Sequence, residues 1–175
     1  MNFQQYFGIF SAKHIDYATQ FLLQTLSTTP VKFPTKTPLN LLDLACGNGV
    51  IGHWLHQKYP TANLTVVDDA WLAIESAKLN LPKGEVRFVY GDGLSSIEPK
   101  SMDMVVTNPP FHFGYENNIE VSLNLFKEVK KVLKPGGQFI IVANQHLNYA
   151  THLSKNYSSV VVLAENNRFT VYKAS

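Results

Sequence analysis

An Asn-Pro-Pro-Phe sequence at residues 108–111 is the pattern with the clearest chemical meaning in this chain. Two consecutive prolines restrict the backbone, and a residue before proline is held extended. The amide oxygen of Asn108 and the carbonyl oxygen of Pro109 can therefore converge as two fixed acceptors, with the flat face of Phe111 beside them. Such a group fits a planar ring that carries an exocyclic amine. A rigid loop with a core phenylalanine is the structural alternative.

Methyl transfer to an exocyclic amine is the reaction that this arrangement suits. The nitrogen lone pair of such an amine is delocalised into the ring. Two hydrogen bonds favour a more tetrahedral nitrogen, whose lone pair then points at a methyl donor. Orientation and proximity carry the catalysis, and no strong general base is needed. We therefore predict Asn108, Pro109 and Phe111 as the catalytic residues.

A glycine-containing turn at residues 43–49 follows an apolar segment and precedes an amphipathic one. Glycine lets the backbone approach a ligand closely, and the amino end of a following helix offers N–H groups. Gly47, Gly49 and Gly52 match the G-x-G-x-x-G string of dinucleotide-binding proteins. Asp43, inside the strand, instead favours a ligand with an amino-acid end over one with a pyrophosphate. A tight structural turn is the alternative.

Acidic residues end the next two apolar segments. Asp68 and Asp69 come about 25 residues after Asp43, where nucleoside-binding α/β folds place a carboxylate that accepts hydrogen bonds from ribose hydroxyls. We predict Asp68 as that ligand, with a helix N-cap or a solvated carboxylate as the alternative, and Asp69 as the helix cap. Asp92 is placed beside the same crevice, either near an adenine amine or in a plain turn.

Apolar segments alternate with amphipathic ones along the chain, which indicates a doubly wound α/β sheet. Strands are predicted at residues 39–46, 63–68, 85–90, 102–107 and 138–143, and a closing antiparallel hairpin at residues 158–164 and 169–172. Helices are predicted at residues 15–26, 50–59, 70–79 and 119–133.

Composition limits the class of protein. The chain has 175 residues and is 45% hydrophobic, which excludes wholesale disorder. Its net charge of +2 is small for a protein that depends on electrostatic binding of nucleic acid. A single cysteine, Cys46, excludes an internal disulfide, and no third ligand is spaced to complete a metal site with His53 and His56. Residues 27–38, rich in proline, serine and threonine, predict a linker.

We accordingly divide the chain into an N-terminal helical extension and linker, residues 1–38, and one α/β domain, residues 39–175. No segment has the roughly 18 uninterrupted apolar residues of a membrane span, and the N-terminal residues do not read as a secretory signal. A cytoplasmic location is expected.

Taken together, these residues resemble the S-adenosylmethionine-dependent methyltransferases that methylate amines. More closely, the chain is similar to the catalytic domain of the ribosomal RNA guanine-N(2) methyltransferases, the small-subunit methyltransferase C and large-subunit methyltransferase G group. The resemblance covers nearly the whole chain. It is carried by residues 10–11, 41–52, 67–68, 108–112, 141–149 and 166–169.

The resemblance implies a Rossmann-like sheet of seven mostly parallel strands, with helices on both faces and the last strand antiparallel. It implies S-adenosylmethionine as the cofactor, guanine in ribosomal RNA as the methyl acceptor, and ribosomal RNA or a ribosomal subunit as the partner. The cofactor-binding residues are then expected to be Asp43, Ala45, Gly47, Gly49, Asp68, Asp69, Asp92 and Asn108.

Two departures from the family pattern bear on activity. The family has glycine where this chain has Ala45, so an extra methyl group is expected near the methionine end of the cofactor. The family also carries an N-terminal domain that helps to hold RNA. We therefore expect a separate RNA-binding domain or partner to provide this RNA binding.

Several alternatives stay open at this level. The methyl acceptor can be adenine in nucleic acid or a protein glutamine in place of guanine, or the chain can be a cofactor- or RNA-binding module without catalysis. Trp71 is expected either to cover the adenine or to lie in the core. A basic group is expected either to touch phosphates or to form a solvated helix face, and it comprises Lys127, Lys130, Lys131 and Lys134.

Overall fold

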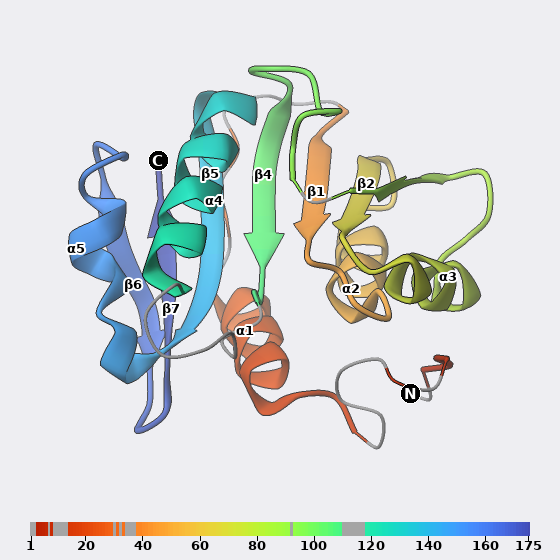
Figure 1. Cartoon of the computed structure of the whole chain (residues 1–175), viewed down its shortest axis with the longest axis horizontal. Helices are drawn as coiled ribbons and strands as arrows, with labels where there is room; N and C mark the ends of the chain where they lie inside the picture. Colours follow the sequence, from red (N-terminus) through yellow and green to blue (C-terminus); the bar gives the residue numbers. More distant parts are fainter. Residues whose placement is uncertain are drawn as a thin grey trace.

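A mixed sheet is the centre of the fold (Figure 1). The computed structural model describes residues 3–6, 8, 14–29, 31, 33, 38–91, 93–109 and 118–175, apart from the side chains of residues 118–123. The strands are β1 (Asn40–Leu44), β2 (Asn63–Asp68), β3 (Val86–Tyr90), β4 (Met102–Thr107), β5 (Leu133–Asn144), β6 (Val160–Glu165) and β7 (Phe169–Ala174). They lie in the order β3-β2-β1-β4-β5-β7-β6.

Strand direction agrees with the sequence-based prediction. Strands β1 to β5 pair in parallel, and β7 runs antiparallel between β5 and β6. The fold class of a seven-stranded, mostly parallel sheet with its last strand antiparallel is therefore confirmed. The predicted closing hairpin is β6 with β7.

Helices cover both faces of the sheet. They are α1 (Tyr17–Thr28), α2 (Val50–Lys58), α3 (Trp71–Asn80), α4 (Asn118–Val132) and α5 (Tyr149–Leu153), with a short 3-10 helix, η1 (Gln145–Leu147). One buried cluster packs α4 and α5 on one face, and a second packs α1, α2 and α3 on the other. Among the segments described, none of the helices combines the length and apolarity needed to cross a bilayer.

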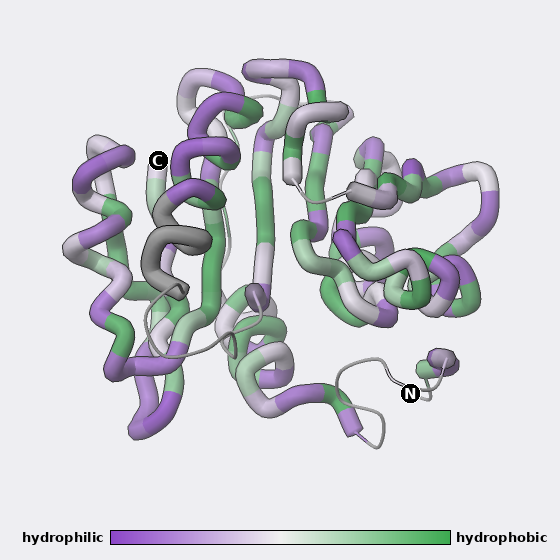
Figure 2. The backbone as a smooth tube through the Cα atoms, in the orientation of Figure 1, coloured by the Kyte–Doolittle hydropathy of each residue, from purple (hydrophilic) through white to green (hydrophobic). Residues whose placement is uncertain are grey.

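Because both faces are covered, the central strands are apolar on both sides. In β5, Phe139 and Ile141 face the α4 side while Ile140 and Val142 face the α1 side. Figure 2 shows this strand as a hydrophobic stretch. The two-residue period of a strand thus divides one apolar run between two cores.

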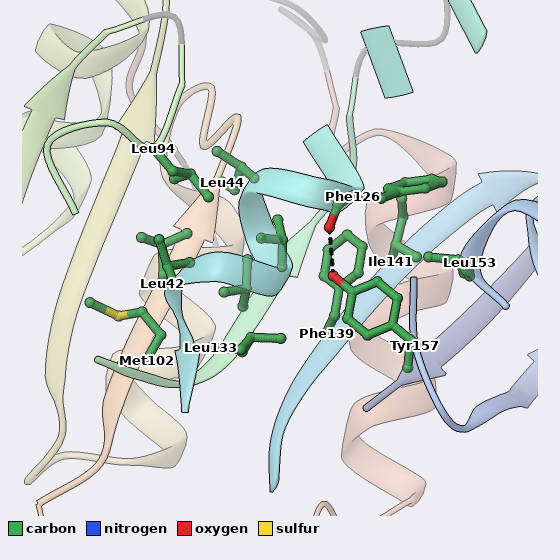
Figure 3. Packing of buried hydrophobic residues seen from close by; sticks show 14 of the residues in the cluster. Leu42, Leu44, Leu94, Met102, Phe126, Leu133, Phe139, Ile141, Leu153 and Tyr157 are labelled. Carbon is green, nitrogen blue, oxygen red and sulfur yellow. Dashed lines mark hydrogen bonds between the residues drawn. The ribbon is translucent and has the colours of Figure 1, made fainter. Parts of the chain in front are cut away.

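Aromatic packing fixes α4 on its face of the sheet (Figure 3). The rings of Phe126 and Phe139 meet edge to face with centroids 5.9 Å apart, and Tyr157 stacks on Phe139 at 5.8 Å. The Tyr157 hydroxyl donates to the Phe126 carbonyl oxygen over 2.9 Å. Burial raises the pKa of Tyr157, so this hydroxyl keeps its proton.

The N-terminal helix α1 belongs to the opposite core. Its buried residues Ala18, Leu22 and Leu26 share one face of the helix, and α1 contacts β5 and β7. Asp16 caps its amino end, since its Oδ2 accepts from the backbone N–H groups of Ala18 and Thr19. The amino end of α1 lies at the carboxyl end of β4, where the side chain of Asn108 donates to Asp16.

Two boundaries differ from the prediction. Leu133 pairs with Met102 and Gln138 with Met104, so the Lys-Pro-Gly-Gly segment at residues 134–137 bulges within β5 and does not simply end a helix. α1 runs into the predicted linker, because Ser27 and Thr28 complete its last turn. Neither η1 nor α5 was predicted, since five helical residues after a turn give no periodic signal.

We expect Leu22→Ala to lower the free energy of unfolding by about 2–4 kcal/mol, because it leaves a cavity where α1 meets the sheet. Urea denaturation measures this change. Gln24→Ala, on the exposed side of the same helix, is the matched control and should change stability by less than about 0.5 kcal/mol. Equal effects of the two substitutions would show that α1 is not packed as described.

Candidate functional site

The carboxyl ends of three adjacent strands form the candidate site. Leu44 of β1 pairs with Val67 of β2 on one side and with Thr107 of β4 on the other. The residues that follow each strand therefore emerge at one edge of the sheet, which is where ligands bind in open α/β sheets. This register brings the predicted glycine-containing turn, Asp68 and Asn108 to the same edge.

The turn after β1 is held by backbone hydrogen bonds and by one carboxylate. The N–H of Cys46 donates to the carbonyl oxygen of Val67 over 3.0 Å, and that of Gly49 to the carbonyl oxygen of Cys46 over 2.8 Å. The N–H of Gly47 donates to Oδ2 of Asp68 over 2.8 Å. Asp68 thereby ties the turn to the end of β2.

The three glycines of the predicted G-x-G-x-x-G string, two in the turn and Gly52 in α2, have different structural roles. A Cβ on Gly49 would lie 3.1 Å from the side chains of Ala77 and Leu81, so this glycine lets α2 pack closely on α3. A Cβ on Gly52 would lie 3.2 Å from Oδ2 of Asp43. Gly47, with φ +54°, has open space at its Cβ position and is the glycine of the three that faces the edge of the sheet.

Asp43 is a fully buried carboxylate beneath the turn. Its Oδ2 accepts from the N–H of Gly52 over 2.7 Å, whereas its Oδ1 accepts no hydrogen bond from the described residues. Burial raises the pKa of Asp43 from 3.8 to about 7; the Gly52 hydrogen bond opposes this shift, and the nearby charge of Asp68 adds to it. An acceptor without a partner in this place can receive a hydrogen bond from a ligand or an ordered water.

Asp68 and Asp69 have different surroundings. Oδ1 of Asp68 accepts from the N–H of Ala70 over 2.9 Å, so both oxygens of this half-buried carboxylate touch backbone. Burial raises its pKa. The prediction that Asp69 caps the next helix is wrong: Ala70 is the N-cap of α3 and makes no side-chain capping bond. Asp69 is exposed.

Two further residues of the turn, Ala45 and Cys46, differ in backbone conformation and burial. Ala45 has φ +57°, in the left-handed region that a Cβ disfavours, which explains why glycine suits this position. Cys46 is buried in the α1 side of the core. Burial raises the pKa of its thiol, and the charges of Asp43 and Asp68 add to that effect, so Cys46 is a packing residue and not a nucleophile.

Asn108 follows β4 and is linked to α1. Its Nδ2 donates to Oδ2 of Asp16 over 2.9 Å and to Oγ1 of Thr19 over 2.8 Å. Its Oδ1 is buried and has no hydrogen-bond donor among the described residues. Pro109 is buried beside it. This oxygen is an acceptor without a partner among the described residues, and the sequence-based role of Asn108 stays a prediction.

A small cavity of about 60 Å³ joins these parts. Its lining includes Asn108, the turn at Ala45 to Asn48, and the residues before and within the first turn of α1, among them Asp16 and Thr19. The turn and the Asn-Pro loop thus meet across one hollow. Sequence reasoning missed Asp16 and Thr19, and the available signal was an aspartate directly before an amphipathic segment, which is typical of a helix cap.

Asp92, Phe111 and Trp71 are the predicted residues that remain. Asp92 and Phe111 lie outside the described residues. Trp71 is 57% exposed at the start of α3, so its placement in the core is wrong. In the part of the chain that the structure describes, no three histidine, cysteine, aspartate or glutamate side chains gather as a metal site would need.

The lysines near α4 are exposed or engaged locally. The Lys134 ammonium lies 2.6 Å from Oδ2 of the buried Asp103, and that of Lys130 lies 5.0 Å from the ring centroid of Tyr157. Lys127 and Lys131 are exposed. These contacts agree with a solvated, locally paired surface, and none of these four lysines lines the cavity.

The methyltransferase small domain family (MTS) matches residues 1–173 of the chain. The chain belongs to this family. It is 36% identical over 170 residues to the ribosomal RNA large subunit methyltransferase G of Alcanivorax borkumensis, which is 95% of this chain and 42% of that protein. It is 39% identical over 169 residues to the ribosomal RNA small subunit methyltransferase C of Hahella chejuensis, which is 95% of this chain and 47% of that protein.

A solved structure with the same fold is the 16S rRNA N2 G1207 methyltransferase of T. thermophilus in complex with AdoMet and guanosine. The TM-score is 0.83 at 26% sequence identity, over 96% of this chain and 45% of that chain. The MTS chain thus spans less than half the length of these relatives. The resemblance inferred from the sequence is confirmed at the level of the family and of its catalytic domain.

The buried carboxyl of Asp43 gives the free MTS chain a specific pH dependence. Because its folded pKa of about 7 lies above the ordinary 3.8, its contribution to stability is complete below pH 4 and is lost as pH rises through 7. Asp43→Asn carries no charge. Between pH 5 and 7 the wild type should therefore lose stability relative to this variant, by up to about 1.4 kcal/mol per pH unit in urea denaturation. Parallel profiles would contradict the burial of a titrating carboxyl here.

The left-handed backbone of Ala45 gives a second prediction. Ala45→Gly should raise the free energy of unfolding by about 0.5–1 kcal/mol, because the relief of backbone strain exceeds the added chain entropy of glycine. Ala150→Gly, within α5, is the matched control and should lower it by about 1 kcal/mol. Thermal or urea unfolding of both variants measures the signs, and a loss of stability in both would count against the strained turn.

Proposed function

We propose that this MTS chain transfers a methyl group from S-adenosylmethionine to the exocyclic amine of guanine in ribosomal RNA. The observation that carries the proposal is the buried Oδ1 of Asn108, which has no donor among the described residues. A buried acceptor without a partner is costly, and the N–H of a planar amine is a donor that this amide oxygen suits.

The residues at the edge of the sheet fit S-adenosylmethionine. The unpartnered Oδ1 of the buried Asp43 offers an acceptor beneath the turn, and Gly47 leaves open space above it. Asp68 stands at the end of β2, where a ribose is bound in related folds, and each of its oxygens has a second lone pair available. When bound, this cofactor supplies a methyl group attached to a positively charged sulfur.

Asn108 would act on the target amine by orientation. Its Oδ1 would accept one N–H of the amine and the carbonyl oxygen of Pro109 would accept the other, so that the nitrogen lone pair points away from the ring plane. These fixed acceptors need no reorganisation during the reaction. The proton that the amine loses leaves through solvent, because its pKa falls steeply once the nitrogen is methylated and positively charged.

The relatives support guanine in ribosomal RNA as the acceptor. Two of them are named as ribosomal RNA methyltransferases, and the T. thermophilus structure holds guanosine with AdoMet. A base in a duplex must be flipped out of the stack to reach such a site, which costs a few kcal/mol. Because the net charge is only +2, we propose that further protein or a partner supplies much of the RNA backbone binding.

Asn108→Ala should abolish methyl transfer and leave cofactor binding near that of the wild type, since the side chain aligns the acceptor amine. Thermal-shift titration with S-adenosylmethionine provides the binding control: a site of about 10 µM at 1 mM ligand stabilises by roughly 2.7 kcal/mol. Undiminished turnover in Asn108→Ala would contradict the mechanism.

The acceptor class is tested with the same proteins and radiolabelled S-adenosylmethionine. Ribosomal RNA, DNA and protein fractions serve as parallel acceptors, and digestion of labelled RNA identifies the methylated base. Label in the N2-methylguanine of ribosomal RNA supports the proposal. Label only in adenine or only in protein would assign the same chemistry to a different acceptor, and no thermal shift with the cofactor would favour a non-catalytic module.

A further inference from the structure

The amide of Asn108 has one orientation, fixed by residues about 90 positions earlier in the chain. Oδ2 of Asp16 and Oγ1 of Thr19 each accept one N–H of Nδ2, over 2.9 and 2.8 Å. The opposite end of the amide, Oδ1, is left with no donor among the described residues. Among the described residues, the side chain is thus bound on its nitrogen side and has no donor on its oxygen side.

Asp16 is itself held in place before it contacts Asn108. Its Oδ2 accepts from the backbone N–H of Ala18 over 3.0 Å and of Thr19 over 3.1 Å, as the N-cap of α1. A carboxylate has no proton to donate. If the Asn108 amide turned over, its Oδ1 would face this negatively charged oxygen and both hydrogen bonds of Nδ2 would be lost. The network therefore excludes the flipped amide.

The packing of α1 transmits this constraint to the site. Leu22 and Leu26 are buried against the sheet, and Thr19 is 8% exposed on the same helix. α1 contacts β5 and β7, whereas Asn108 follows the neighbouring strand β4. The amino end of α1 is thereby held beside the Asn-Pro loop by the hydrophobic core and not by chain connectivity.

Asp16 also changes the strength of the acceptor. Hydrogen bonds in a chain polarise one another, and a charged member makes the effect larger. A carboxylate that accepts from Nδ2 draws positive charge to the nitrogen end of the amide. The Oδ1 atom becomes more negative and so a better acceptor for an incoming N–H.

We propose that Asp16 and Thr19 are positioning residues for methyl transfer, which hold and polarise the Asn108 amide so that Oδ1 meets the amine of the target base. This inference rests on the proposed function, in which Asn108 accepts from that amine. The two residues act through Asn108 and touch neither the amine nor the methyl group. Two residues of the active centre then come from α1 and its N-cap, which precede β1 in the chain.

Asp16→Asn tests the carboxylate while keeping the helix cap, since asparagine caps a helix as well as aspartate does. The new amide can donate as well as accept, so both orientations of Asn108 become accessible. We expect kcat with ribosomal RNA to fall about 10- to 100-fold, while the Kd for S-adenosylmethionine and the midpoint of unfolding stay near those of the wild type.

Thr19 allows a matched comparison on one helix. Thr19→Val has nearly the same shape but no acceptor, and should lower kcat about 3- to 10-fold, while Thr19→Ser keeps the hydroxyl and should restore most of that loss. Thr25→Val removes another buried hydroxyl of α1. This hydroxyl donates to the Phe21 carbonyl oxygen and lies almost two helical turns beyond Thr19, away from Asn108. This control should leave kcat unchanged.

A direct readout of the amide separates failure of this inference from failure of the proposed function. The side-chain N–H signals of Asn108 in ¹⁵N-labelled protein should exchange slowly in the wild type and fast in Asp16→Asn and Thr19→Val. Unchanged exchange overturns the positioning role even if no acceptor is methylated by the wild type. With an active wild type, undiminished kcat in both variants, an equal loss in Thr25→Val, or weaker cofactor binding with unchanged kcat would each overturn it.

Discussion

The register of β1 between β2 and β4 is the constraint on which the site depends. Leu44 is level with Val67 and Thr107, so three chain segments leave the sheet at one edge. Backbone ladders fix this alignment, and Thr107 adds a buried hydrogen bond from its Oγ1 to the Leu44 carbonyl oxygen over 2.6 Å. A slip of one residue would turn every side chain of β1 to the other face, moving Asp43 away from α2.

Two polar side chains at that edge each have a buried oxygen atom. Asp43 and Asn108 each keep one oxygen without a donor among the described residues. Each such group carries a desolvation cost of about 1–3 kcal/mol or more, which packing elsewhere has to offset. The aromatic cluster around Phe126 and the contacts of α1 lie on opposite faces of the sheet and provide this packing.

Much of the fold could be predicted from the sequence because its signals are local. Apolar runs such as residues 63–68 and 102–107 have the length of buried strands, and both predictions match the strand bounds. The bulge at residues 134–137 could not be predicted, since it arises from pairing between Met102 and Leu133 on different strands. The cap at Asp69 was assigned wrongly because α3 begins at Trp71, one residue later than predicted, which makes Ala70 the N-cap.

The sequence by itself determined the family, the positions of the strands in the α/β domain, and Asn108 as the residue with an acceptor to offer, since residue types and short spacings carry that information. Only the tertiary structure decided which glycine faces the site and which way the Asn108 amide points. The amide is bound by Asp16 and Thr19, which core packing brings to it. Contacts between residues so far apart depend on the packed sheet and leave no pattern in the local sequence.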